Sequence, residues 1–287
     1  MTPPVQGCGS LRDRLAEAAG FVQRRISGEF ETDEFGFDPE FNATLLMPVA
    51  RMLYRNWFRV RMRGLEHIPD IGPALVVANH GGVLPFDMIM VQAGLFYEHP
   101  GHRTLRLLGA DLIYEMPALA RLARKSGHTH ASRAEASRLL AAGELVGVCP
   151  EGFKGTGKLF SERYRLARFG RGGFAVTAMR AGVPIIPCAI VGAEEIYPMI
   201  ADVKPLARLL GLPYFPVTPL FPWLGPLGAV PLPSNWIIEF GKPVATDSYG
   251  AAAADDPSAV SELADGVRTT IQQMLDDLVI ERGPAFG

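Results

Sequence analysis

The sequence predicts a layered α/β domain in which a largely parallel sheet is flanked by helices. Residues 72–80, 144–150 and 183–192 form short apolar runs with Gly or Pro at one or both ends, which is typical of buried parallel strands. Segments with helical spacing of apolar residues separate these runs along the chain. Because strands that alternate with helices tend to pair in parallel, one helix-covered sheet is expected.

Length and composition are those of an ordinary globular protein with one large domain. The chain has 287 residues, of which 48% are hydrophobic and 20% charged, so a substantial core is expected and wholesale disorder is excluded. Its three cysteines, Cys8, Cys149 and Cys188, are too far apart for a zinc motif. The last two lie in apolar runs, which fits a reducing compartment, and no disulfide is expected.

The first 63 residues are interpreted as an arm followed by an amphipathic, membrane-associating helix. Residues 1–40 are polar and predict one short helix near 11–25. Residues 41–58 predict a helix with arginines at every fourth position and an apolar stripe formed by Leu46, Val49, Leu53 and Trp57. Such a helix either lies on an anionic membrane or packs on the domain with its arginines solvated, and both alternatives stay open.

The rest of the chain, residues 64–287, is expected to form the domain itself. Pro85 suits a first helical turn, Gly143 suits a helix end, and Asp256 with Pro257 predicts the start of an amphipathic last helix. The expected elements are strands at 58–69, 72–80, 104–110, 144–150, 183–192 and 235–244, and helices at 85–96, 116–125, 131–143, 170–182 and 257–278.

No targeting or membrane-spanning segment is expected. Residues 1–20 lack the apolar centre of a signal peptide, which predicts a cytoplasmic location, at the inner face of the cell membrane. Residues 209–238 carry no charge, but their seven prolines forbid a regular helix. This apolar segment either reaches toward a bilayer or wraps over the core.

Charge is segregated along the chain although the net charge is only −2. Residues 154–180 hold seven basic side chains and one acidic one, so the middle of the chain is where anions are expected to bind. The arginines are not interleaved with stacking aromatic residues, and nucleic-acid binding is therefore not expected.

His80 and Asp87 are the candidate catalytic residues. His80 follows a predicted buried strand, where open α/β sheets place ligands, and Asp87 falls in the first turn of the next predicted helix. A carboxylate that orients an imidazole makes a general base. No G-x-S-x-G turn is present, so the nucleophile need not belong to the protein, and a hydroxyl of the substrate can take that role. The alternative is a packed histidine and a helix-capping aspartate.

A glycine-rich basic stretch follows the strand at 144–150. Residues 152–158 match G-x-x-x-x-G-K, but Leu159 stands where a nucleotide-binding loop needs Ser or Thr, and no long helix is predicted after it. A site for another phosphate is the stronger interpretation, with Lys154, Lys158, Arg163 and Arg165 beside exposed turn amides. An ordinary basic loop is the alternative.

Three sequence blocks resemble the lysophospholipid acyltransferase family, which includes 1-acylglycerol-3-phosphate acyltransferases. They are "NHGGVLPFD" at 79–87, "PEG" at 150–152 and "VPIIPCAIVG" at 183–192. The family carries Asn-His-x4-Asp, Pro-Glu-Gly followed by basic residues, and a late Val-Pro-x-x-Pro strand in the same order. The resemblance covers Leu65 to Lys242 and implies an acyltransferase domain in residues 64–287.

The resemblance also implies roles for individual residues. His80 would deprotonate an acceptor hydroxyl for attack on an acyl thioester, and Asp87 would orient it. The donor would be acyl-CoA or acyl carrier protein, the acceptor a lysolipid or glycerolipid at a membrane surface, with no metal and no bound cofactor. Residues implied in acceptor binding are Glu151, Gly152, Lys154, Lys158, Arg163 and Arg165, with Gly127 and Arg133 from a loosely matched further block.

The spacing departs from the family motif. The chain reads His-x6-Asp, with Leu84 and Pro85 as the apparent insertion, and this longer spacing resembles the branch that acylates neutral glycerolipids. Lysophosphatidic acid is the first choice of acceptor, and a neutral glycerolipid or another lysophospholipid is the alternative. A thioesterase or lipid hydrolase and a non-catalytic lipid-binding protein are the rival hypotheses. The oligomeric state is not predicted.

Overall fold

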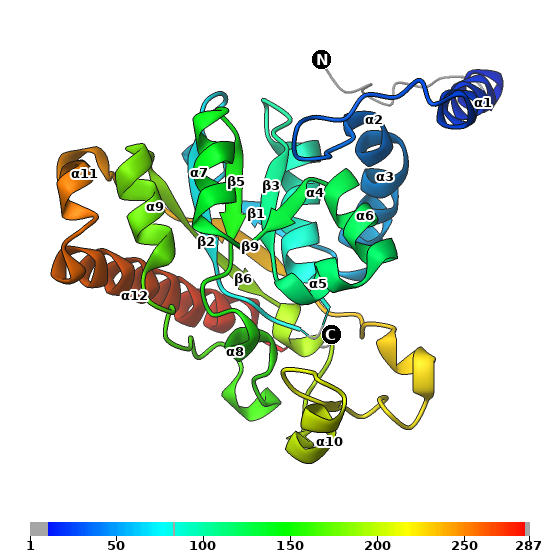
Figure 1. Cartoon of the computed structure of the whole chain (residues 1–287). Helices are drawn as coiled ribbons and strands as arrows, with labels where there is room; N and C mark the ends of the chain where they lie inside the picture. Colours follow the sequence, from blue (N-terminus) through cyan, green and yellow to red (C-terminus); the bar gives the residue numbers. More distant parts are fainter. Residues whose placement is uncertain (1–10, 83, 285–287) are drawn as a thin grey trace.

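The computed structural model describes residues 11–82 and 84–284, and Cys8 lies outside them. Its centre is a seven-stranded sheet in the order β1-β9-β6-β2-β5-β3-β4 (Figure 1). Neighbouring strands pair in parallel except β6 and β9, so the predicted α/β class with a largely parallel sheet is confirmed. The strands are β1 (Arg61–Arg63), β2 (Ala74–Ala78), β3 (Leu105–Gly109), β4 (His128–His130), β5 (Leu145–Val148), β6 (Ile185–Val191) and β9 (Ile237–Phe240).

Helices cover both faces of the sheet. One face packs against α7 (Arg133–Ala141), α9 (Gly173–Ala181) and α12 (Pro257–Arg282), and the other against α4 (Phe86–Glu98) and α6 (Pro117–Lys125). The long α12 follows the predicted pattern: Asp256 caps it by accepting the Ser258 N–H, and its buried side chains recur every three or four residues. These layers enclose two apolar cores, one on each face of the sheet.

Further helices and a small strand pair complete the chain. They are α1 (Leu11–Ser27), α5 (Asp111–Glu115), α8 (Phe153–Thr156), α10 (Lys204–Leu209), α11 (Gly250–Ala253) and the small antiparallel pair β7 (Ala201–Asp202) and β8 (Pro216–Val217). Single 3₁₀ turns occur at Leu65–His67, Phe160–Glu162, Ala193–Glu195, Gly225–Ala229 and Asp247–Tyr249.

Residues 39–57 form one winding helical stretch, which consists of α2 (Pro39–Phe41), α3 (Met47–Met52) and two π-helical segments, Asn42–Leu46 and Leu53–Trp57. The predicted apolar stripe is confirmed only in part: Leu46 and Leu53 pack against the core, but Val49 is 54% exposed, and the fully buried stripe is that of Met47, Ala50 and Tyr54. The sequence of this stretch contains two apolar stripes with helical spacing, one residue apart. Packing against α4 decides which of the two is buried. The stretch then leads into β1, so the sheet includes residues before the predicted boundary at 63.

Residues 210–236 of the proline-rich segment 209–238 run outside the seven-stranded sheet without a long helix, as the prolines predict, and the segment enters β9 at Ile237. Its side chains include Leu209, Trp223 and Leu227, which are 80%, 72% and 66% exposed. Trp57 donates from its indole nitrogen to the Pro231 carbonyl at 3.0 Å, which joins this segment to the helical stretch. None of the helices in residues 11–82 and 84–284 has the length and apolarity needed to span a bilayer.

Candidate active site

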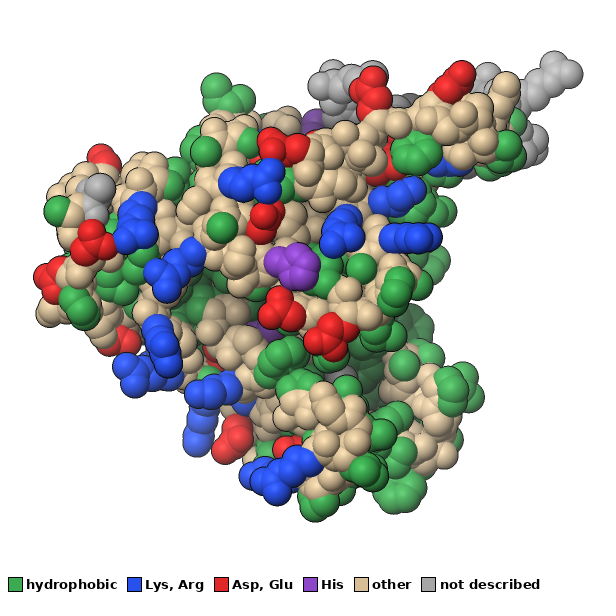
Figure 2. Space-filling view, in the orientation of Figure 1, with side chains coloured by type: hydrophobic (Ala, Val, Ile, Leu, Met, Phe, Trp, Pro, Cys, Tyr) green, Lys and Arg blue, Asp and Glu red, His purple; other side chains and the backbone are tan. Residues whose placement is uncertain are grey.

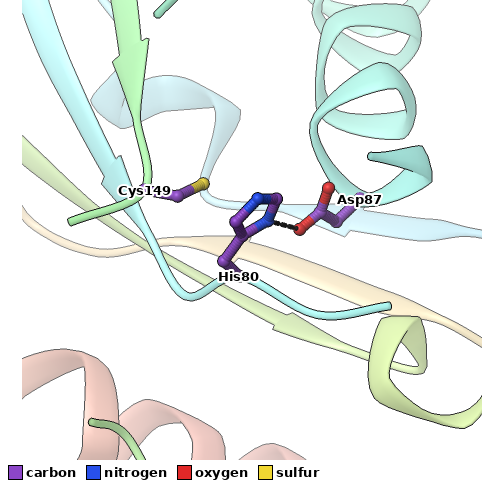
Figure 3. Close-up of side chains that lie close together, drawn as sticks. All are labelled: His80, Asp87 and Cys149. Atoms are coloured by element: carbon purple, nitrogen blue, oxygen red, sulfur yellow. Dashed lines mark hydrogen bonds and ion pairs between the residues drawn. The ribbon is translucent and has the colours of Figure 1, made fainter. Parts of the chain in front are cut away.

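His80 and Asp87 meet at the carboxyl end of β2. His80 follows that strand and Asp87 lies in the first turn of α4, with His80 Nδ1 and Asp87 Oδ2 2.5 Å apart (Figure 3). The Asp87 side chain is fully buried, while the His80 side chain keeps 20% of its surface exposed. The pair therefore combines a fixed carboxylate with an imidazole that is reached from outside.

The longer His-x6-Asp spacing is taken up in the loop before α4, which begins only after Pro85. Asp87 remains in the first helical turn, where its carboxylate accepts the backbone N–H groups of Gly81 at 3.0 Å and Met88 at 2.8 Å. With the imidazole as third donor, a buried carboxylate has the hydrogen bonds that its charge requires. The two extra residues thus leave the contact intact.

The electrostatics of the pair favour the imidazolium form of His80. Burial is the largest single effect and lowers its pKa, but the Asp87 carboxylate and, to a smaller extent, Cys149 together raise the pKa well above the ordinary 6.5. Asp87 binds Nδ1 and thereby leaves Nε2 to exchange a proton with a ligand. The arrangement is that of a strong general base held in one orientation.

Asn79 fixes the backbone next to His80. Its side-chain amide donates to the Ile190 carbonyl at 2.9 Å, and its side-chain oxygen accepts the Ile190 N–H at 2.7 Å. These two bonds continue the β2–β6 pairing by one step beyond β2. Sequence reasoning assigned no role to Asn79, although its place next to His80 in the motif was a signal.

Glu151 holds the site together instead of facing a ligand. Its side chain is buried, and its two oxygens accept the backbone N–H of His80 at 3.2 Å and of Ala167 at 2.6 Å. The implied role in acceptor binding is therefore not supported by the geometry, because both oxygens are already bonded. This carboxylate instead ties the loop after β5 to the loop after β2.

Lys158 is enclosed by two glutamates. Its ammonium lies 3.0 Å from Glu194 and 3.4 Å from Glu151, and only 9% of its side chain is exposed. Burial raises the pKa of Glu194 to about 7, against the opposing effect of Lys158. The charge of Lys158 is thus neutralised within the protein, and its expected phosphate contact stays a prediction. The nucleotide-loop alternative fails, because such a loop needs a free lysine and a long helix, and α8 spans four residues.

The other basic residues expected at the site remain open to solvent. Lys154 and Arg165 are exposed, as is Gly152 at the turn after β5, and the exposed Arg163 lies over the Phe160 ring at 4.2 Å. Figure 2 shows Lys and Arg side chains gathered around α8 and its flanking loops. These cations stand on the same edge of the sheet as His80, since all follow the carboxyl end of β5.

Gly127 and Arg133 lie at opposite edges of the sheet. Gly127 precedes β4 and contacts Arg106, so it lies at the amino ends of the parallel strands and is not brought together with His80. Arg133 begins α7 after the carboxyl end of β4 and lines a cleft of about 200 Å³ together with Arg171. A second cleft, of about 470 Å³, opens between α5, Phe153 and residues 211–213.

Cys149 is the neighbour of His80 that sequence reasoning missed. Because β2 and β5 pair with Val77 opposite Val148, the residues that follow these strands come together. One ligand atom each from His80, Asp87 and Cys149 lies within 4.8 Å of the others, a set that could hold a metal ion. A metal bound to all three would compete with His80 for the Asp87 carboxylate, so the geometry fits the His–Asp pair better.

A family model described as "Acyltransferase" matches residues 59–191 of the chain. Uncharacterized proteins of Mycobacterium tuberculosis and Mycobacterium leprae are 55% and 54% identical to it over 276 residues, which is 96% of this chain and 77% and 75% of theirs. The human "DGAT1/2-independent enzyme synthesizing storage lipids" is 26% identical over 220 residues, 77% of this chain and 62% of that protein.

Among solved structures, a 1-acyl-sn-glycerophosphate (LPA) acyltransferase, PlsC, of Thermotoga maritima has a similar fold. The TM-score is 0.56 at 17% sequence identity, and the match covers 91% of this chain and 88% of that one. The likeness confirms the expected architecture of a layered α/β domain with a mostly parallel sheet.

Proposed function

The chain belongs to the acyltransferase family, and from that premise we propose that it moves a fatty acyl group from a thioester donor to the hydroxyl of a glycerolipid. The observation that carries the proposal is the contact of His80 Nδ1 with the buried Asp87 carboxylate, 2.5 Å away, with the imidazole open to the surface. A base so placed activates a hydroxyl that diffuses to it.

In the proposed reaction, His80 Nε2 takes the proton of the acceptor hydroxyl while the oxygen attacks the thioester carbonyl. Asp87 stabilises the imidazolium that forms, and the proton leaves with the departing thiol. Glu151 and Asn79 hold the backbone of His80 in place through the bonds described above. The donor is acyl-CoA or acyl carrier protein. Both carry the acyl group as a thioester, and they differ in the molecule to which the thioester sulfur belongs.

Lysophosphatidic acid is the first candidate acceptor, with phosphatidic acid as its product. The exposed Lys154, Arg163 and Arg165 support it, since they stand beside the turn at Gly152 on the catalytic edge of the sheet. A group of exposed cations favours an anionic head group such as a phosphate. The Thermotoga maritima protein is named as an acyltransferase for the same acceptor.

A neutral glycerolipid is the second candidate acceptor. Lys158, the most enclosed cation of the site, is already neutralised by Glu194 and Glu151, which weakens the attraction for a phosphate. The longer His–Asp spacing and the storage-lipid enzyme among the relatives agree with an uncharged acceptor.

A lipid panel separates these candidates. Purified protein is given acyl-CoA or acyl carrier protein with lysophosphatidic acid, other lysophospholipids, monoacylglycerol or diacylglycerol, and products are identified by mass spectrometry. An acylated lipid is the expected product, and its head group names the acceptor. Free fatty acid as the main product would indicate a hydrolase, and release of no product would refute the proposal.

The enzyme is further proposed to act as a peripheral protein on the cytoplasmic face of the membrane. An apolar surface supports this: the exposed stripe of Leu45, Val49 and Met52 continues through Trp57 into the proline-rich segment. Figure 2 shows hydrophobic side chains over that segment, at the lower right, and along the adjoining edge. Exposed apolar surface of this extent is typical of an interaction site, and a lipid substrate resides in a bilayer.

A further inference from the structure

Cys149 lies against His80, and the direct transfer of the acyl group does not use it. Figure 3 shows its sulfur beside the imidazole, on the side away from Asp87. One ring nitrogen of His80 and the Cys149 sulfur lie within 4.8 Å of each other, and the thiol lies 3.8 Å from the Asn79 carbonyl. Thiol, imidazole and carboxylate therefore form one cluster, with the imidazole between the other two groups.

Cys149 and His80 are both partly exposed to solvent. The exposed fraction of the His80 side chain is 20%. Cys188, on the neighbouring strand β6, is fully buried. Of the two cysteines within the described residues, only Cys149 combines a neighbouring base with access from outside.

The surroundings make removal of the thiol proton depend on His80. Burial raises the pKa of Cys149, and the adjacent imidazole opposes that rise. A thiol with a raised pKa is a weak nucleophile until a base takes its proton, and a base oriented by a third group is the arrangement that activates thiols in enzymes. Here that base is His80 and the third group is Asp87.

We propose that Cys149 carries the acyl group as a thioester between donor and acceptor. This inference rests on the proposed acyltransfer function and adds a covalent step to it. The group bound to the Cys149 sulfur is a fatty acyl group taken from acyl-CoA or acyl carrier protein.

Both steps balance with the reactants already named. In the first, His80 takes the Cys149 proton, the sulfur bonds to the acyl carbon, the bond from that carbon to the donor sulfur breaks, and His80 returns the proton to the departing thiol. In the second, His80 takes the acceptor hydroxyl proton, the oxygen bonds to the acyl carbon, and Cys149 leaves and regains its proton. One thioester replaces another, so the first step needs no further reactant.

Trapping the acyl-enzyme tests the inference on the unmodified active site. Because Cys8 lies outside the described residues, the experiment uses Cys8→Ala protein, mixed with palmitoyl-CoA without acceptor, quenched in acid and weighed by intact-protein mass spectrometry. The expected result is one palmitoyl group per chain at Cys149, a matching burst of free CoA, and discharge upon addition of the acceptor at a rate no slower than turnover. The Cys188→Ala variant keeps the adduct and His80→Ala loses it.

Rates separate this inference from the proposed function. We expect Cys149→Ala and the size-matched Cys149→Ser to lower acyltransfer by about 10²-fold or more, and initial rates of the parent protein to give the parallel-line pattern of a two-step transfer. An active protein with no adduct, intersecting lines and an unchanged rate in Cys149→Ser would overturn the acyl-enzyme and leave acyltransfer standing. Absence of transfer to any acceptor would refute the proposed function instead.

Discussion

His80 Nδ1 and Asp87 Oδ2 lie 2.5 Å apart, although their positions are two residues further from each other in the chain than in the related family motif. The loop before α4 absorbs the extra length, so the carboxylate still comes from the first helical turn. The contact, and not the spacing, is what the chemistry of a general base requires.

Removal of the base is the first prediction. His80→Ala should lower acyltransfer by about 10²–10⁴-fold, which is the usual contribution of a general base. Product formation is followed by mass spectrometry, with circular dichroism to verify the fold. His102→Ala, which alters a histidine at another place in the chain, should retain activity. An unchanged rate in His80→Ala would exclude His80 as the base.

The pH dependence of the rate is the second prediction. The Asp87 carboxylate holds the pKa of His80 well above 6.5 despite burial, so the neutral, reactive imidazole becomes abundant only as the pH rises through that raised pKa. The acid limb of kcat/KM should therefore lie above the ordinary histidine range. In Asp87→Asn the limb should move to lower pH and the maximal rate should fall. A limb at the same pH in both proteins would contradict this coupling.

The third prediction concerns Glu194 and stability. Burial raises its pKa from 4.5 to about 7, so the folded protein binds the proton more tightly than the unfolded chain between these values. Stability from this group is therefore present below pH 4.5 and declines as the pH rises to 7, by about 3 kcal/mol at 1.36 kcal/mol per pKa unit. Glu194→Gln should flatten the pH dependence of the free energy of unfolding over that window, measured by urea denaturation. The exposed Glu162→Gln serves as control, and the same slope in both variants would count against the assignment.

The fourth prediction concerns the buried ion pair at the end of α12. Arg282 Nη2 lies 2.6 Å from Glu195 Oε1, with 4% and 0% of the two side chains exposed. Arg282→Met should lower the free energy of unfolding by about 3–5 kcal/mol, because it leaves a buried carboxylate without a partner. The double variant Arg282→Met with Glu195→Met should lose less than the two single variants added together. Additive losses in urea denaturation would show that the two residues act independently.

Membrane binding is the fifth prediction. Val49 and Met52 are 54% and 58% exposed on the apolar stripe, and burial of each such side chain in lipid contributes about 1.5–3 kcal/mol. Val49→Glu or Met52→Glu should therefore reduce the fraction that sediments with anionic phospholipid vesicles by about tenfold or more. Ile71→Glu is the matched control, because Ile71 is 86% exposed in the loop before β2. Equal losses of vesicle binding in all three variants would show that the membrane contact lies elsewhere on the protein.

The order of the main elements and the catalytic pair could be predicted from the sequence because both depend on local signals. Strands such as β2 and β5 are short apolar runs between turn residues, and the α12 stripe recurs with helical spacing. His80 and Asp87 are close in the chain, so one loop and one helical turn suffice to bring them together. Local hydrogen bonding and side-chain periodicity depend on residues within one segment. They can therefore be predicted from the sequence of that segment alone.

Only the tertiary structure decided which distant residues share the site. The order of the strands places β5 beside β2 and thereby brings Cys149 to His80, while the same parallel sheet carries Gly127 to the opposite edge. Packing enclosed Lys158 between two carboxylates and turned Val49 outward. Strand order, register and the choice between two apolar stripes depend on contacts between segments far apart in the chain, and those contacts are fixed by the packing of the whole core.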